Sequence, residues 1–317
     1  MPPQIGATVA PITPPRVAVL IPCLNEEITI GKVIDDFRAA LPEAEVYVFD
    51  NNSTDRTAEI ARARGATVVK EKRPGKGFVV QAMFRQVEAD CYLMVDGDDT
   101  YSAPDARQLL APLLDGQADM VVATRLAGYV QGSFPSLHVF GNRALTGIVN
   151  WVFATRLHDM MSGYRALTRD LARSVALLSH GFEVETELTL RVLEGRFVIQ
   201  EVPLPYRERP AGSFSKLRTF RDGFRVLFSI FNVLRTYRPF AFYGSIGAAL
   251  LAGGLVAGGY VLVDYLEDRY VDKVPTAILA TGLVILAGFA FGMGLLLNTI
   301  SERFNALAAL VRLRSKP

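Results

Sequence analysis

Residues 91–99 read Cys-Tyr-Leu-Met-Val-Asp-Gly-Asp-Asp, and this stretch carries the strongest pattern in the chain. Its apolar first half predicts a buried strand of a parallel sheet. Asp96, Asp98 and Asp99 then crowd at the end of that strand, where open α/β sheets bind their ligands. Because carboxylates repel one another and hard cations prefer oxygen ligands, the pattern predicts a site for Mg²⁺ or Mn²⁺. The alternative is an acidic turn that caps a helix starting near Pro104.

Apolar strands and amphipathic helices alternate from residue 16 onward. Strands are predicted over residues 16–21, 46–49, 66–69, 91–95, 120–123 and 197–202. Helices are predicted over residues 26–40, from a polar turn at 50–55 to about 64, over 77–88 and across most of 141–195. Ser53 or Thr54 is expected to cap the second of these helices. The alternation implies a mainly parallel sheet with right-handed crossovers, and therefore the α/β class.

Polar residues follow three of the predicted strands, at 25–27, 50–52 and 96–99. The ends of parallel strands meet at one edge of a sheet, so these clusters should line one crevice of nucleotide size. The loop 72–77, Lys-Arg-Pro-Gly-Lys-Gly, lies between the second and third clusters, and Lys76 in it can meet a phosphate near a helix N-terminus. The loop is not a P-loop, because no Ser or Thr follows its lysine.

Hydrophobic residues make up 50% of the 317 residues, and the mean hydropathy of +0.24 is high for a purely soluble protein. The excess is concentrated in residues 240–263 and 274–300, which contain no charged residue. Each run exceeds the roughly 20 residues that a helix needs to cross a bilayer. A buried core helix of that composition is the less common alternative. The intervening loop is acidic and the outer flanks are basic, so we expect a multi-pass inner (cytoplasmic) membrane protein with both termini and the catalytic domain in the cytoplasm.

Five segments are expected along the chain. They are a disordered tail over 1–15, a globular domain over 16–212, a basic amphipathic interfacial helix over 213–238, a two-span transmembrane region over 239–300 and a basic cytoplasmic tail over 301–317. The helix over 213–238 carries its arginines off an apolar stripe, which favours a place on anionic headgroups over packing on the globular domain. The proline-rich start lacks the pattern of a signal peptide, and nothing in the sequence points to a nucleic-acid partner.

Several motifs together resemble the family 2 glycosyltransferases with a GT-A fold. They are Ile21–Glu27, Asp50–Asp55, Gly75–Gly77 and Asp96–Asp99. Three later runs resemble the branch that contains dolichyl-phosphate mannose synthase and the bacterial polyprenyl-phosphate glycosyltransferases; they are Asp159–Arg165, Gly181–Glu185 and Ser213–Leu217. The resemblance covers residues 17 to about 300, because many bacterial members also end in two membrane helices.

The resemblance implies roles for individual residues. Nucleotide contacts would come from Pro22, Asn25, Glu26, Asp50, Asn52, Lys76, Gly77 and Asp96. Asp96 and Asp98 would hold the cation, while Thr100 stands where mannose synthases often have Gln, which leaves a third ligand open. Catalytic positions would be Asp98, Arg125, Asp159 and Arg165. The acceptor phosphate and the diphosphate would be held by Arg125, Arg143, Ser162, Arg209 and Lys216.

Each of these roles has a structural alternative. Arg143 and Arg165 could be surface residues of a helix, and Arg209 and Lys216 could serve only anionic lipid. Glu183 and Glu185 could be an acid pair that the dipole favours at a helix N-terminus.

The reaction that the resemblance implies is an inverting transfer of a sugar from a UDP- or GDP-sugar to a polyprenyl phosphate. One alternative is transfer to another lipid acceptor, diacylglycerol or ceramide. Another is a non-catalytic membrane protein that binds a nucleotide sugar. A processive polysaccharide synthase is disfavoured, because the single tryptophan, Trp151, lies outside a Gln-x-x-Arg-Trp motif.

Two small-residue spacings in the spans, Gly254-x-x-x-Gly258 and Gly288-x-x-x-Gly292, allow close helix packing within one chain or in an oligomer. The resemblance implies a homo-tetramer.

Overall fold

The computed structural model describes residues 14–125, 136–179, 181, 183–207, 209–210, 228 and 231–315. The chain divides into two compact units, Met1–Asp222 and Gly223–Pro317. The predicted tail over 1–15 and most of the predicted interfacial helix over 213–238 lie outside the described residues; residues 231–237 are helical.

The first unit is built on a seven-stranded sheet with the order β3-β2-β1-β4-β6-β5-β7. Its strands are β1 (Val17–Cys23), β2 (Glu45–Asp50), β3 (Thr67–Lys70), β4 (Cys91–Met94), β5 (Met120–Thr124), β6 (Arg165–Thr168) and β7 (Ile199–Pro203). β6 runs antiparallel to both of its neighbours, and the other paired strands are parallel. The predicted α/β class with a mainly parallel sheet is therefore confirmed.

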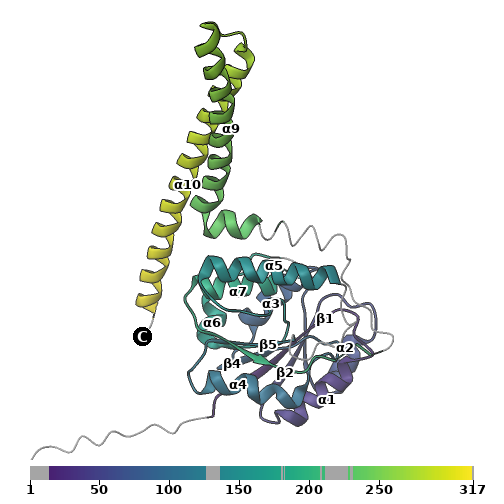
Figure 1. Cartoon of the computed structure of the whole chain (residues 1–317). Helices are drawn as coiled ribbons and strands as arrows, with labels where there is room; N and C mark the ends of the chain where they lie inside the picture. Colours follow the sequence, from purple (N-terminus) through teal and green to yellow (C-terminus); the bar gives the residue numbers. More distant parts are fainter. Residues whose placement is uncertain are drawn as a thin grey trace, which may run out of the picture. The chain divides into compact units, whose positions relative to one another are not determined.

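Helices cover both faces of this sheet (Figure 1). They are α1 (Ile30–Ala40), α2 (Thr57–Ala63), α3 (Lys76–Gln86), α4 (Ala106–Leu114), α5 (Ser136–Phe153), α6 (Arg169–Ser174) and α7 (Val184–Glu194), with a short 3₁₀ turn at Ala103–Asp105. Side chains of α1, α2 and α4 pack with alternate residues of β1 in one apolar core. Side chains of α3, α6 and α7 pack with the intervening residues of β1 in a second core on the opposite face. This alternation follows from the two-residue period of a strand.

Two local expectations were wrong. β6 lies within the stretch expected to be mostly helical, because a four-residue strand is too short to show a period of its own. Ser53 and Thr54 do not cap α2, which begins at Thr57. Asp55 Oδ1 instead accepts the backbone N–H of Thr57 (3.0 Å) at that end.

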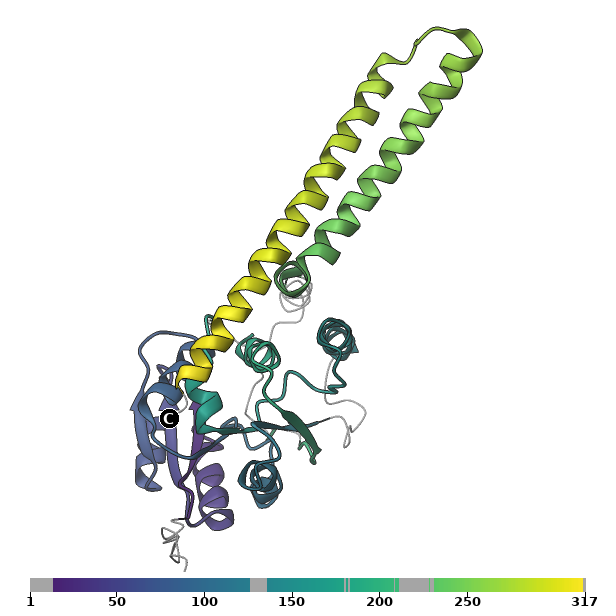
Figure 2. The ribbon, with the colours of Figure 1, turned by 90° about the vertical axis from the view of Figure 1, so that its left-hand side faces the viewer.

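The second unit contains two long helices, α9 (Pro239–Asp268) and α10 (Val274–Ser315), which run side by side (Figure 2). Residues Pro239–Glu267 and Val274–Phe304 are long and apolar enough to cross a membrane. Apolar side chains such as Val256 (75% exposed) and Phe289 (72%) point away from this pair, as side chains facing lipid would. α10 continues to Ser315, so most of the predicted tail is helical.

The two predicted glycine spacings behave differently within this pair. A Cβ at Gly254 would lie 2.9 Å from Val284 Cγ2 and 3.1 Å from the Ala280 carbonyl oxygen, so Gly254 lets α9 approach α10 closely. Gly288 and Gly292 have no described neighbour within 4 Å of such a Cβ. The first spacing therefore packs the hairpin, and the second faces away from it.

Candidate active site

The polar clusters after β1, β2 and β4 lie at one edge of the sheet. Cys23 pairs with Asp50 in the parallel register of β1 and β2. The Asn51 backbone N–H donates to the Cys23 carbonyl (2.8 Å). β4 runs parallel to β1 on its other side and ends at Met94, directly before Val95 and the acidic cluster. The strand ends thus meet as the sequence predicted.

Four of the residues predicted to contact a nucleotide lie at or beside this edge. Asp50 is 4% exposed, and its Oδ1 accepts the Ser53 backbone N–H (3.1 Å). Pro22 and Glu26 are partly exposed, at and just after the end of β1. Gly77 is buried in the first turn of α3. One carboxylate oxygen of Asp50 is therefore already used by the turn that follows β2.

Asn25 and Asn52, also predicted to contact a nucleotide, hold neighbouring loops. Asn25 Oδ1 accepts the Thr54 backbone N–H (2.7 Å), and Asn52 Nδ2 donates to the Lys72 carbonyl (3.0 Å). Both asparagines have positive φ angles, 54° and 65°, a conformation that asparagine tolerates better than most residues. In this arrangement both side chains shape the edge through contacts within the chain.

Asn51 fixes the basic loop, a role that the sequence did not reveal. Its side chain is buried; Nδ2 donates to the carbonyls of Glu71 (3.1 Å) and Arg73 (2.7 Å), and Oδ1 accepts the Gly75 N–H (2.7 Å). A polar turn in the sequence does not show which of two adjacent amides turns inward. Asn51 thereby holds the loop that leads into Lys76.

Asn51→Asp is expected to lower the free energy of unfolding by about 2–3 kcal/mol, because it removes two buried donors and turns a carboxylate toward two carbonyls. The measurement is a denaturant titration of the full-length protein in detergent, followed by fluorescence. Trp151 is the only tryptophan and lies on α5, so the signal reports on the first unit. Asn52→Asp is the matched control, and an equal loss in both variants would contradict the role of Asn51.

Lys76 opens α3 and places its ammonium between two carboxylates. Its Nζ lies 2.5 Å from Asp96 Oδ1 and 2.5 Å from Glu185 Oε1, and its side chain is only 11% exposed. Burial alone would lower the pKa of Lys76, but the charges of Asp96 and Glu185 raise it overall. The ammonium therefore stays charged. Glu185, at the start of α7, therefore contacts this site, in addition to being an acid that the dipole favours at a helix N-terminus.

Asp98 is held by a second basic side chain. Its Oδ2 lies 2.6 Å from Arg209 Nη2, and its Oδ1 accepts the hydroxyl of Thr100 (2.6 Å). Burial and the charge of Asp96 raise the pKa of Asp98. Thr100, whose position left a third cation ligand open, here orients Asp98 through a hydrogen bond.

A divalent cation fits the donor set of Asp96 and Asp98. The two acids lie at a strand end and repel each other, and each is paired with a basic side chain. Gly163 packs against Asp96 so closely that any Cβ would collide with its carboxylate. No group of three or more His, Cys, Asp or Glu gathers among the described residues. A cation here would thus take further oxygens from a diphosphate and water, as Mg²⁺ commonly does.

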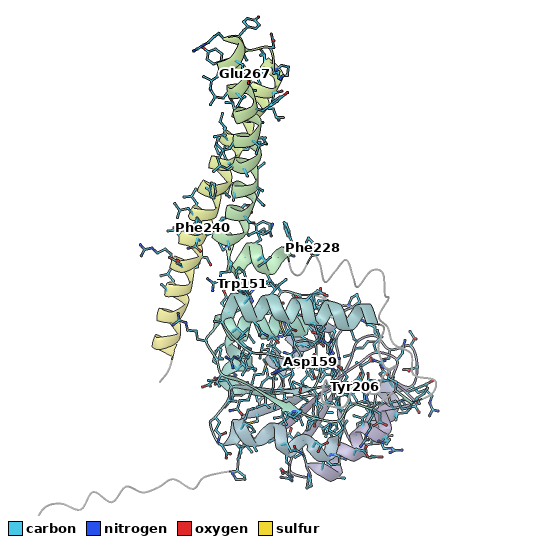
Figure 3. The ribbon with its side chains drawn as sticks, in the orientation of Figure 1. Trp151, Asp159, Tyr206, Phe228, Phe240 and Glu267 are labelled. Atoms are coloured by element: carbon cyan, nitrogen blue, oxygen red, sulfur yellow. The ribbon has the colours of Figure 1, made fainter. Side chains whose placement is uncertain are left out.

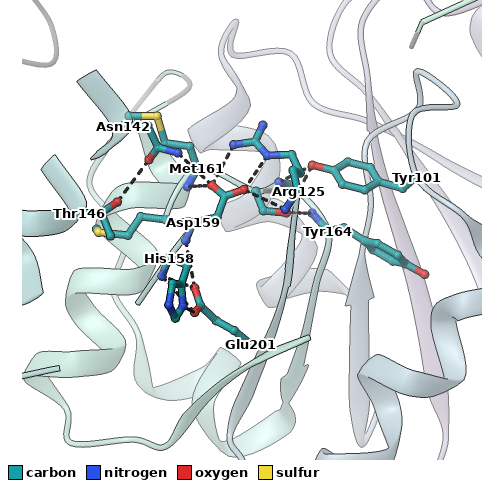
Figure 4. Close-up of polar contacts among 12 residues, drawn as sticks. Tyr101, Arg125, Asn142, Thr146, His158, Asp159, Met161, Tyr164 and Glu201 are labelled. Carbon is teal, nitrogen blue, oxygen red and sulfur yellow. Dashed lines mark hydrogen bonds and ion pairs between the residues drawn. The ribbon is translucent and has the colours of Figure 1, made fainter. Parts of the chain in front are cut away.

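Arg125 and Asp159, both predicted to be catalytic, form a two-contact ion pair in which Asp159 is buried and Arg125 is partly buried (Figure 4). Arg125 Nε lies 2.7 Å from Asp159 Oδ2, and Nη2 lies 2.9 Å from Oδ1. The Arg125 guanidinium also lies over the Tyr206 ring, 5.7 Å from its centroid. Burial would raise the pKa of Asp159, but Arg125 lowers it overall. Figure 3 shows Asp159 and Tyr206 inside the first unit.

Other elements hold Asp159 in place. Asn142 on α5 donates to Asp159 Oδ1 (3.2 Å). Glu201 on β7 accepts the backbone N–H groups of His158 (2.8 Å) and Asp159 (3.0 Å). α5 therefore holds the Asp159 carboxylate and β7 holds its backbone, and the carboxylate in turn orients Arg125.

Arg165 is placed differently from the prediction. Its side chain is fully buried, and it donates to the carbonyls of Ser162 (2.7 Å) and Met160 (2.5 Å) and to the Thr189 hydroxyl (2.8 Å). An arginine with no exposed surface has no access to an acceptor phosphate. Arg165 is instead a structural clamp for the loop that contains Asp159.

The remaining residues predicted to contact phosphate differ in their exposure. Ser162 is fully buried, with its Oγ 3.4 Å from the Tyr101 hydroxyl, which also accepts the Gly163 N–H (3.1 Å). Arg143 is exposed on α5. Lys216 lies outside the described residues.

Comparison with known sequences gives a consistent set of relatives. Residues 18–175 match the model of glycosyl transferase family 2. Glycosyltransferase AglJ of Haloferax volcanii is 36% identical, over 90% of this chain and 92% of its own length. The dolichyl-phosphate hexose transferase of the same organism is 34% identical, over 68% of this chain and 92% of its own length.

A solved structure shares the fold. Glucosyl-3-phosphoglycerate synthase from Mycobacterium tuberculosis, in complex with Mn²⁺, UDP and glucosyl-3-phosphoglycerate, matches with a TM-score of 0.57 and 26% identity. The match covers 68% of this chain and 80% of that one. The sheet is therefore of the GT-A type that the resemblance implied.

Proposed function

This chain belongs to glycosyl transferase family 2 and is an enzyme, and we propose that it transfers a sugar from a nucleoside diphosphate to a polyprenyl phosphate. The donor is a UDP- or GDP-sugar, and the product is a polyprenyl-monophosphate-linked sugar with inverted configuration. The relative named dolichyl-phosphate hexose transferase supports this acceptor class.

The observation that carries the proposal is the pairing of two acids after β4 with two basic side chains from other elements. Asp96 pairs with Lys76 and Asp98 pairs with Arg209 at the ligand-binding edge of the sheet. Two carboxylates with two basic groups suit a diphosphate together with a cation, because the carboxylates can hold the cation and the basic groups can contact phosphate oxygens. The Mn²⁺ and UDP in the structure of the mycobacterial synthase support the same reading.

The chemistry requires charge stabilisation more than proton transfer. A phosphate acceptor is already an anion, so it can attack the anomeric carbon without a strong base. Lys76 and Arg209 would bind the leaving diphosphate, and Arg125, oriented by Asp159, would bind the acceptor phosphate. A cation held by Asp96 and Asp98 would offset the charge that develops on the leaving group. Arg143, which is exposed on α5, is a further candidate for binding the acceptor phosphate. Lys216, which lies outside the described residues, is another.

The second unit suits a lipid acceptor. Two helices of spanning length and the predicted basic segment before them would keep the enzyme at the surface where a polyprenyl tail is dissolved. Basic flanks support an inner-membrane protein with its catalytic domain and both termini in the cytoplasm. Gly288 and Gly292, which face away from the hairpin, would be available for contact in a homo-oligomer.

Radiolabel transfer from a panel of UDP- and GDP-sugars to undecaprenyl phosphate tests the proposal. Purified full-length protein in detergent is expected to give a lipid-extractable product with Mg²⁺ or Mn²⁺, and to lose nearly all transfer in EDTA. The same panel with diacylglycerol or ceramide tests the other lipid acceptors. Binding of a donor with no product on any acceptor would favour a non-catalytic protein and overturn the proposal.

A further inference from the structure

Lys76 occupies the carboxylate that a cation would need. Its Nζ lies 2.5 Å from Asp96 Oδ1, within the pair of acids where the cation is proposed to bind. An ammonium and a divalent cation on one carboxylate would repel each other at short range. Lys76 must therefore leave Asp96 when the cation arrives, and a buried ammonium that leaves its partner is costly unless another anion receives it.

Glu185 is placed to receive the Lys76 ammonium. Its Oε1 already lies 2.5 Å from Lys76 Nζ, and its side chain is only 6% exposed. Its second oxygen, Oε2, is buried and has no hydrogen-bond partner among the described residues. A buried carboxylate oxygen without a partner is unfavourable, and a small shift of the ammonium from Asp96 toward Glu185 would satisfy it.

Rigid surroundings favour movement of the lysine over movement of the acids. Glu185 lies in the first turn of α7, between the buried Val184 and Thr186. Asp96 is confined on one side by the backbone of Gly163. Lys76 has a long side chain with several rotatable bonds, so it is the member of the three that can change partner at the lowest cost.

We propose that Glu185 is a positioning residue that takes Lys76 from Asp96 when a divalent cation binds. This inference rests on the proposed cation site. Asp96 is then freed to ligate, and Lys76 stays charged beside the site, where it can contact the diphosphate. Glu185 thus acts on the cation through Lys76 and does not touch it.

The test is Mn²⁺ affinity, measured by electron paramagnetic resonance on the full-length protein without nucleotide sugar. Glu185→Gln is expected to weaken Mn²⁺ binding by about 10- to 100-fold, the usual effect of losing a residue that supports a metal ligand. Glu185→Asp keeps the charge but draws the carboxylate back, and it should weaken binding similarly. Glu183→Gln removes a charge two residues away and should bind like wild type. Thermal unfolding checks that each variant is folded.

A double-mutant cycle decides whether Glu185 acts through Lys76. In a Lys76→Met background, adding Glu185→Gln is expected to leave Mn²⁺ affinity unchanged. A further loss there would mean that Glu185 acts on the cation directly, and wild-type affinity in Glu185→Asp would mean that only its charge matters; either result overturns the inference. If wild type binds no Mn²⁺ either alone or with UDP or GDP added, the proposed cation site fails first.

Discussion

Asp98→Asn is expected to lower the rate of sugar transfer by about 10²- to 10³-fold, the range found when one contact to the charge of a transition state is lost. Asparagine keeps the shape of Asp98 and its bond to the Thr100 hydroxyl but removes the negative charge. The variant should stay folded, because burial and Asp96 already disfavour a charge at this position. The measurements are initial rates at saturating Mn²⁺ and the midpoint of thermal unfolding.

Asp99→Asn is the matched control, one residue along the same turn. Asp99 accepts from Lys32 Nζ (2.8 Å), away from Lys76 and Arg209, and its φ of 58° is tolerated by asparagine. Transfer by this variant should stay near wild type. Near-wild-type transfer by Asp98→Asn would remove Asp98 from the cation site, and equal losses in both variants would point to the turn as a whole.

The edge of the sheet could be predicted because its signal is local. Each of β1, β2 and β4 is an apolar run followed by polar residues, and parallel pairing then brings the strand ends together without further information. The two helices of spanning length were predictable for a similar reason, since length and absence of charge are read directly from the sequence.

The partners of individual side chains were not predictable in the same way. Arg125 and Arg165 have the same chemistry, but only Arg125 keeps exposed surface. The Arg165 side chain is enclosed by groups distant from it in the sequence, such as Thr189 on α7. β6 exists because β4 and β5 pair with it from either side. Burial that arises from such tertiary pairing leaves no periodic trace in a four-residue run.

Glu185 shows a related limit. An acid in the first turn of a helix has a sufficient local explanation in the helix dipole. Its contact with Lys76 joins α7 to α3, which are more than a hundred residues apart in the chain, and becomes visible only when both helices lie on the same face of the sheet. Glu185 is thus favoured both by the helix dipole and by its contact with Lys76, and only the first can be inferred from the sequence.

Asp159→Asn is expected to destabilise the first unit by about 3 kcal/mol, the lower end of the range for a broken buried pair, because it leaves the partly buried Arg125 guanidinium without its counter-ion. The loss should be seen in denaturant titrations followed by Trp151 fluorescence. Because Arg125 lowers the pKa of Asp159 in the fold, the pair contributes fully above the unfolded pKa, near 3.8, and its contribution is lost as the pH falls through the lower folded value. The difference between variant and wild type should therefore shrink in acid.

The double variant Arg125→Met/Asp159→Leu separates the structural part of this pair from its chemical part. An apolar pair of similar volume often replaces a buried ion pair with little loss of stability. The double variant should therefore be more stable than Asp159→Asn. Its transfer activity should stay low, because the guanidinium proposed to bind the acceptor phosphate is gone. Recovery of activity together with stability would show that Arg125 only supports the fold. Continued instability would show that the Asn142 amide and the Met161 backbone N–H, which also donate to the Asp159 carboxylate, require it as well.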